Sequence, residues 1–129
     1  MTDQKTKVLI IEDEEMLVNM YISKFTKDGY QAEKAINGTM GLEQAKNIKP
    51  DIILLDIMMP EIDGFMVLKN LKEDIDTKDI PVIMLTNLGQ EEDIEKGKNL
   101  GAIDYLVKAN LTPGQVVAKV KEVLNKPTA

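Results

Sequence analysis

Short, apolar runs alternate with longer amphipathic stretches along this chain. Strands buried on both faces of a parallel sheet are continuously apolar, whereas helices repeat their apolar residues every three or four positions. The runs predict five strands, at Val8–Ile11, Tyr30–Ile36, Asp51–Leu55, Pro81–Leu85 and Ile103–Val107. Tyr30–Ile36 is the most polar of the five, so we expect it at an edge of the sheet.

Amphipathic stripes between and after these runs predict five helices. The stripes cover Leu17–Phe25, Met40–Asn47, Gly64–Lys72, Gln90–Leu100 and Val116–Leu124. Gly29 is a stop signal for the first helix, and Pro113 suits the first turn of the last. The helix at Gln90–Leu100 is strongly polar, and an interior glycine such as its Gly97 costs about 1 kcal/mol relative to alanine. We therefore expect this helix to be the loosest.

The order of elements is a strand followed by a helix, five times. Right-handed crossovers between parallel strands place helices on both faces of an open, doubly wound α/β sheet. We predict one domain over residues 1–129, with its core at about 7–124 and tails at Met1–Thr6 and Lys126–Ala129, where Pro127 ends any helix. The pair Asp63-Gly64 is typical of a turn that starts a helix.

The composition excludes several kinds of chemistry. The 129 residues include no Cys and no His, and all 16 basic residues are Lys. This excludes disulfides, thiolate zinc sites, a cysteine nucleophile, a histidine base and an arginine clamp. The net charge of −6 disfavours direct binding to nucleic acid or to an anionic membrane. The N-terminal apolar run is too short for a signal peptide or a membrane span, so we expect a cytoplasmic protein.

Polar residues stand directly after four of the apolar strands. They are Glu12 and Asp13, Asp56, Thr86, and Lys108. Each alone is an ordinary helix cap or strand end. Ligands bind such sheets beyond the carboxyl ends of the strands, and there all of these residues should converge on one rim.

The carboxylates of this set predict a metal site. Three carboxylates in one pocket repel one another and raise each other's pKa, which a divalent cation relieves. With oxygen ligands only, the expected ion is Mg²⁺. We expect Asp13 and Asp56 as direct ligands, Glu12 as a direct or water-mediated one, and the backbone carbonyl of Met58 as a further ligand.

Asp56 is the expected nucleophile, because it ends a fully apolar strand that would hold it rigidly. An aspartate carboxylate in such a position can attack a phosphoryl group and form an aspartyl phosphate. Catalysis of that transfer is mostly positioning and charge neutralisation, here by Mg²⁺ and the Lys108 ammonium. The Thr86 hydroxyl would donate a hydrogen bond to a phosphoryl oxygen. The set holds no strong base to activate hydrolytic water.

The strand ends IIEDEE, LLDIMMPEIDG and IMLTN, with the stretch GAIDYLVKA, closely resemble the receiver domain of two-component response regulators. The resemblance extends from about Lys7 to Leu124. It implies a flavodoxin-like fold with strand order 2-1-3-4-5 and phosphorylation of Asp56 by a sensor histidine kinase or a histidine phosphotransfer protein. It also implies Mg²⁺ bound by Asp13, Asp56 and the Met58 carbonyl, assisted by Glu12.

The same resemblance implies a phosphorylation-driven switch. Thr86 would move toward the phosphoryl group, Lys108 would pair with it, and Tyr105 would turn inward. The surface around residues 86–124 would change, and an unknown output protein would bind through the 90–124 face. We therefore expect a signalling domain rather than an enzyme, either stand-alone or cut from a longer protein, which catalyses its own phosphorylation and slow autodephosphorylation.

Three departures from the family pattern stand near the site. Ala109 follows Lys108 where the family usually has a proline joined by a cis bond, which leaves open whether this bond is cis or trans. Asn87 replaces a usually small residue and could partly gate the phosphoryl site. Met58 and Leu88 are bulky and apolar at positions that modulate attack by water in the family, which is the reason for expecting slow autodephosphorylation.

Three alternatives belong to other functional classes. A pseudo-receiver that binds partners without phosphorylation stays open because of Ala109 and Asn87. A Mg²⁺-dependent phosphatase of the haloacid dehalogenase type needs a second Asp where this chain has Met58. A flavodoxin-type FMN carrier needs a Ser/Thr/Gly-rich phosphate loop where this chain has the four acids of residues 12–15.

Overall fold

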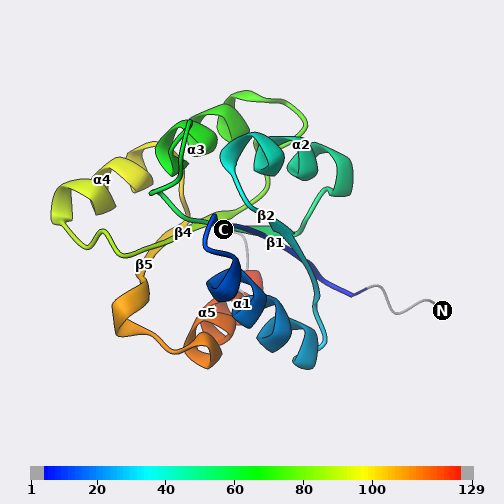
Figure 1. The fold of residues 1–129 in the computed structure, drawn as a ribbon. Helices are drawn as coiled ribbons and strands as arrows, with labels where there is room; N and C mark the ends of the chain where they lie inside the picture. Colours follow the sequence, from blue (N-terminus) through cyan, green and yellow to red (C-terminus); the bar gives the residue numbers. More distant parts are fainter. Residues whose placement is uncertain (1–4, 126–129) are drawn as a thin grey trace.

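A computed structural model describes residues 5–125 as a five-stranded sheet between two layers of helices (Figure 1). The predicted tail segments at residues 1–4 and 126–129, with Pro127, lie outside the described residues. The strands are β1 (Lys7–Ile11), β2 (Gln31–Ala35), β3 (Ile52–Leu55), β4 (Val82–Thr86) and β5 (Asp104–Val107). The helices are α1 (Glu15–Lys27), α2 (Gly38–Ile48), α3 (Gly64–Glu73), α4 (Glu91–Asn99) and α5 (Pro113–Asn125). All ten predicted elements are confirmed, with ends within three residues of the expected ones.

The sheet is entirely parallel and has the strand order β2-β1-β3-β4-β5. This confirms the flavodoxin-like, doubly wound fold. In the register, Ile11 of β1 lies beside Leu55 of β3, and Leu55 lies beside Met84 of β4. The last residues of β1 and β3 are therefore level, and β4 runs two residues beyond Met84 to Thr86. β2 lies at an edge and is only partly buried, as its polar sequence predicted.

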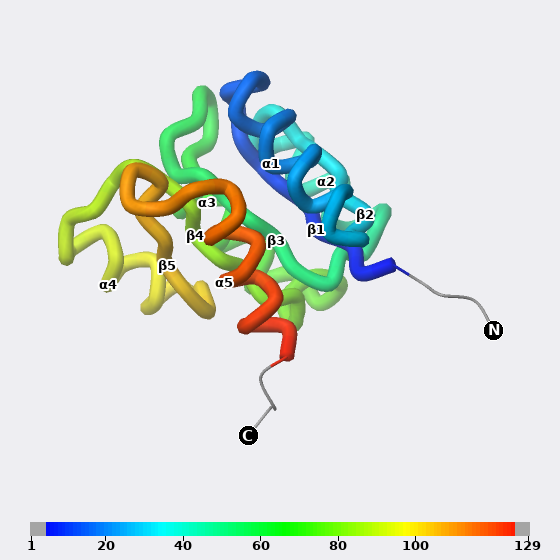
Figure 2. The backbone as a smooth tube through the Cα atoms, turned by 90° about the horizontal axis from the view of Figure 1, so that it is seen from below, coloured from blue at the N-terminus to red at the C-terminus, as the bar shows by residue number. Residues whose placement is uncertain are grey.

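Helices cover both faces of the sheet, and each face has its own apolar core (Figure 1). Figure 2 shows α1 and α5 side by side over one face, where they contact each other. Helices α2, α3 and α4 lie over the other face. Because successive side chains of a strand point to opposite faces, the apolar runs of β1, β3 and β4 supply both cores.

The turn from β3 into α3 is tightly packed. Asp63 Oδ1 accepts a hydrogen bond from the Met66 amide at 2.9 Å, so Asp63 caps α3 as its position before Gly64 predicted. The Gly64 amide donates to the Ile57 carbonyl at 2.8 Å. A Cβ atom on Gly64 would lie 2.2 Å from the carbonyl oxygen of Asp56, so only glycine allows α3 to start this close to the candidate nucleophile.

The glycine inside α4 has a packing role. Gly97 is the only buried residue of α4, and a Cβ there would lie 3.2 Å from Tyr105 Cδ2 and 3.4 Å from Met84 Cγ. Beside it, the Lys96 ammonium lies 4.5 Å from the centre of the Phe65 ring. Gly97 thus brings α4 close to β4 and β5. That α4 is the loosest helix stays a prediction.

The segment after β5 settles the peptide bond that the sequence left open. The described residues contain no cis peptide bond, so Lys108–Ala109 is trans. Lys108 begins a short 3₁₀ turn, Lys108–Asn110, which the sequence did not predict. The turn leads into α5, whose first residue is Pro113, as predicted. Among residues 5–125, no helix is long and apolar enough to cross a membrane.

Candidate functional site

The side chains expected at the carboxyl ends of the strands do converge. They line one pocket of about 190 Å³ at the rim of the sheet. Its lining residues are Glu12, Asp13, Glu14, Asp56, Met58, Thr86, Asn87 and Lys108. The parallel register explains the convergence, since these residues stand at or just beyond the carboxyl ends of neighbouring strands, which share one rim.

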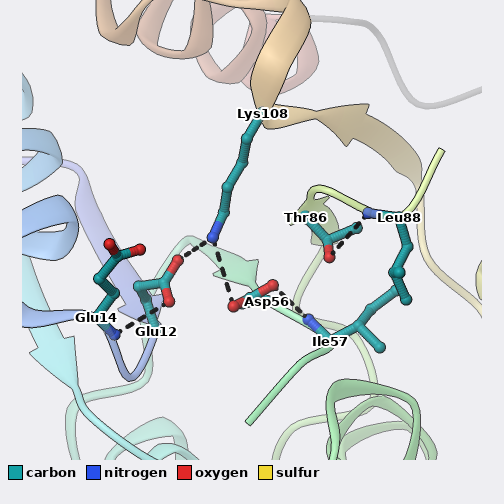
Figure 3. A network of polar contacts seen from close by, with 7 residues as sticks. All are labelled: Glu12, Glu14, Asp56, Ile57, Thr86, Leu88 and Lys108. Atoms are coloured by element: carbon teal, nitrogen blue, oxygen red, sulfur yellow. Dashed lines mark hydrogen bonds and ion pairs between the residues drawn. The ribbon is translucent and has the colours of Figure 1, made fainter.

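Asp56 lies at the floor of the pocket, immediately after β3. Its residue is only 6% exposed, and its amide donates to the Ile11 carbonyl at 3.0 Å, which joins it to β1. Its Oδ1 accepts a hydrogen bond from the Ile57 amide at 2.8 Å, and its Oδ2 lies 3.4 Å from Lys108 Nζ (Figure 3). The backbone thus holds one carboxylate oxygen, and the other faces the only ammonium group of the pocket lining.

Glu12, like Asp56, is buried and fixed by backbone hydrogen bonds and by Lys108. It is 3% exposed, and its amide donates to the Ala35 carbonyl of β2 at 3.0 Å. Its Oε2 accepts from the Glu14 amide at 3.2 Å, while Oε1 pairs with Lys108 Nζ (Figure 3). Asp13 is exposed at the mouth of the pocket.

The three carboxylates are arranged as a cation site. One oxygen from each of Glu12, Asp13 and Asp56 lies within 4.8 Å of the others. A hard divalent cation with oxygen ligands fits this donor set, and Mg²⁺ typically uses one or two carboxylates and keeps several waters. The predicted carboxylate ligands therefore lie close enough together for such an ion, and their binding of Mg²⁺ stays a prediction. No contact of the Met58 carbonyl bears on its predicted role, which stays a prediction.

The carboxylates that line the pocket outnumber its single ammonium group. Burial raises the pKa of Glu12 to about 7, and the nearby Asp56 charge adds to the rise against the opposing effect of Lys108. Burial by itself would lower the pKa of Lys108. The hydrogen bond to Glu12 and the charges of Asp56 and Glu12 outweigh burial, so the Lys108 pKa is raised. Lys108 therefore stays charged, and the carboxylates need further positive charge.

Thr86 and Tyr105 are connected through the backbone of Leu88. Thr86 is fully buried at the end of β4, and its Oγ1 accepts a hydrogen bond from the Leu88 amide at 3.5 Å (Figure 3). The Tyr105 hydroxyl donates to the Leu88 carbonyl at 2.6 Å, and Tyr105 is 9% exposed. Burial, with smaller contributions from Asp93 and Asp56, raises the pKa of Tyr105 to about 12, so the hydroxyl keeps its proton.

Sequence reasoning placed Glu12, Asp13, Asp56, Thr86 and Lys108 at this rim but did not single out Glu14, which also lines the pocket, and missed the role of Leu88. It treated Leu88 only as a bulky neighbour, and a residue's backbone contacts leave no signal in its side-chain type. Asn87 lines the pocket, and its expected role in partly gating the phosphoryl site stays a prediction. The Met58 side chain is 64% exposed and borders both the pocket and an adjoining apolar groove.

Similar proteins include several regulators of transcription. The chain is 38% identical over 120 residues to the DNA-binding dual master transcriptional regulator RpaA of Synechocystis, covering 93% of this chain and 49% of that protein. It is 37% identical over 120 residues to the phosphate regulon regulatory protein PhoB of Escherichia coli, covering 93% and 52%. The chain thus spans about half the length of these relatives.

Solved structures with the same fold include single receiver units. Chemotaxis protein CheY4 of Vibrio cholerae superposes with a TM-score of 0.87 at 29% identity, over 93% of this chain and 99% of that one. The receiver domain of the Francisella response regulator 1452 superposes with a TM-score of 0.85 at 28% identity, over 93% and 97%. The family profile of the response regulator receiver domain matches residues 8–121. With the pocket described above, these matches establish that the chain belongs to the receiver domain family of two-component response regulators.

Proposed function

We propose that this receiver accepts a phosphoryl group on Asp56 from a phosphohistidine donor, with Mg²⁺ bound in the same pocket. The donor is a sensor histidine kinase or a histidine phosphotransfer protein. The observation that carries the proposal is the Asp56 carboxylate itself, buried at the end of β3 beside a cation-binding cluster and an ammonium group. The proposal is for a signalling domain that catalyses only its own modification.

In this reaction, an Asp56 oxygen forms a bond to phosphorus as the bond from phosphorus to the donor nitrogen breaks. Oδ1 is held by the Ile57 amide, so Oδ2 is the oxygen placed to attack. Lys108 lies next to Oδ2 and neutralises charge on the transferred group. Asp13, Asp56 and the Met58 carbonyl, with assistance from Glu12, would hold Mg²⁺, whose charge would supply the remaining neutralisation.

The phosphoryl group becomes a signal through the link formed by Leu88. A phosphoryl group adds nearly two negative charges and new acceptor oxygens, which attract the Thr86 hydroxyl. The Leu88 amide contacts Thr86, and the Leu88 carbonyl contacts Tyr105, so movement of Thr86 strains both hydrogen bonds. Tyr105 lies against Gly97, which extends the effect to α4. We propose that an output protein reads the 90–124 face that changes in this way.

The first test is the intact mass of the protein after incubation with acetyl phosphate. Wild type should gain one phosphoryl group when Mg²⁺ is present and none in excess chelator. Asp56→Ala should gain none, whereas the matched control Asp76→Ala, which removes an exposed carboxylate from the α3–β4 loop, should behave as wild type. Absence of any mass gain, with no binding of beryllofluoride, would refute the proposal and favour a pseudo-receiver.

We further propose slow autodephosphorylation, because the attacking water must pass Met58 and Leu88. Both side chains border the apolar groove beside the pocket. The loss of the added mass after removal of acetyl phosphate measures the rate. Met58→Asn should shorten the half-life, since its amide can orient water, whereas Met66→Asn, on the exposed face of α3, should not. A wild-type half-life of seconds would contradict this proposal without affecting phosphorylation itself.

A further inference from the structure

We propose that the Lys108 ammonium competes with Mg²⁺ for the carboxylates of the pocket, so that Lys108 weakens metal binding as well as assisting phosphoryl transfer. This inference rests on the proposed Mg²⁺ site. It gives Lys108 a role before the phosphodonor arrives, in addition to its expected role on the phosphoryl group.

The contacts of Lys108 place its charge inside the cation site. Its Nζ pairs with Glu12 Oε1 and lies 3.4 Å from Asp56 Oδ2, so it engages two of the three clustered carboxylates. The exposed fractions of the three side chains are 9% for Lys108, 4% for Glu12 and 8% for Asp56. Water therefore screens these charges poorly, and their interactions are stronger than those of surface pairs.

Glu12 and Asp56 also have few other partners. One oxygen of each accepts a backbone amide, from Glu14 and Ile57, and the other oxygen of each faces Lys108 (Figure 3). A metal ion that binds the carboxylates of Glu12 and Asp56 meets the ammonium as a rival. The two cations also repel each other across a few ångströms of protein interior.

Lys108 can leave Glu12 by a movement of its side chain alone. The bond is trans and opens a 3₁₀ turn, and the long aliphatic stem of Lys108 reaches from that turn to Glu12. Rotation within the stem moves the ammonium without moving β5. Metal binding thus releases Lys108 from Glu12, and the freed ammonium is then available to pair with the incoming phosphoryl group.

The test is a calorimetric titration of the chain with MgCl₂, without a phosphodonor. Lys108→Met removes the charge but keeps much of the stem, and should lower the Kd for Mg²⁺ by about tenfold, which corresponds to about 1.4 kcal/mol. Lys108→Arg keeps the charge and should bind Mg²⁺ like wild type. The control Lys69→Met removes an exposed lysine of α3 and should leave the Kd unchanged.

A second readout separates this role from a merely structural one. Lys108→Met should bind Mg²⁺ more tightly and yet be phosphorylated more slowly by acetyl phosphate, because the two roles of the ammonium have opposite effects. Circular dichroism checks folding of the variant, and Lys108→Gln replaces it if Lys108→Met does not fold.

Two negative outcomes are distinguishable. If wild type binds Mg²⁺ but the neutral variants bind it equally or more weakly, the competition is refuted and the proposed metal site stands. If neither wild type nor the variants bind Mg²⁺, the metal site and the competition are both refuted.

Discussion

Gly64 should be the least replaceable glycine near the site, because it allows α3 to begin against the backbone of Asp56. A Cβ at this position would lie 2.2 Å from the Asp56 carbonyl oxygen and 2.7 Å from Ile57 Cα. Ordinary contacts begin at about 3.4 Å, so the backbone would have to move by about 1 Å. Both contacting atoms belong to the main chain, so no side-chain rotation can relieve the overlap.

The expected cost follows from this geometry. Overpacking a well-packed interior costs about 1–3 kcal/mol, and a clash with backbone should place Gly64→Ala at the upper end, at about 3 kcal/mol. For a domain of this size, that loss lowers the Tm by roughly 10 °C. The shift should also displace Asp56 from Lys108, so phosphorylation by acetyl phosphate should slow more than the loss of stability alone explains.

Urea unfolding followed by circular dichroism measures the stability, and intact mass measures phosphorylation of the folded protein. The matched control is Gly114→Ala in the first turn of α5, where a Cβ would meet nothing closer than 3.7 Å. That change should stabilise the fold by about 0.5 kcal/mol, since alanine restricts the unfolded chain. A Gly64→Ala variant within 0.5 kcal/mol of wild type in an assay that resolves about 0.3 kcal/mol would refute the packing argument.

Three further changes test other contacts of the structure. Tyr105→Phe removes the 2.6 Å hydrogen bond to the Leu88 carbonyl, so it should lower the free energy of unfolding by about 1 kcal/mol and speed amide exchange in the loop before α4. Unchanged exchange would show that other contacts hold this loop. Thr77→Val removes the 2.7 Å bond from the buried Thr77 hydroxyl to the Leu71 carbonyl and should lower the urea midpoint by an amount equivalent to about 1 kcal/mol, without slowing phosphorylation. The pKa of Glu12 is raised from 4.5 to about 7, so its contribution to metal-free stability is complete below about pH 4.5 and is lost as the pH rises through about 7. Glu12→Gln should remove this slope, which reaches at most about 1.4 kcal/mol per pH unit, and an identical slope in both proteins would contradict the assignment.

Most of the fold and the side chains of the site could be predicted from the sequence, because the signals are local and strong. The run Ile52–Leu55 is continuously apolar, so a buried strand ending at Asp56 follows from four residues. Once the strands are parallel, their carboxyl ends share one rim, and residues far apart in sequence meet there. Glu12 and Lys108 are 96 positions apart and nevertheless form an ion pair.

Contacts made by the backbone, or permitted by a missing side chain, could not be predicted in this way. The 3₁₀ turn at Lys108 and the links through Leu88 depend on carbonyl and amide groups, which every residue carries. The sequence suggested that Gly97 weakens α4, since glycine is a poor helix former. The structure shows that Gly97 packs on the ring of Tyr105 in β5. A glycine at this position is explained by this contact with another element and not by the helix itself.

The Lys108 ammonium is held in the pocket by its attraction to Glu12 and Asp56. A side chain held by charge responds to charge: the proposed metal ion would weaken its hold on Glu12, and a phosphoryl group would offer it a stronger partner. The burial and crowding of carboxylates that raise the pKa of Glu12 thus cost stability, but they also suit the pocket to the proposed cation. Neutralising the cluster would stabilise the metal-free fold and abolish the site, so this cost in stability lies where the proposed chemistry requires it.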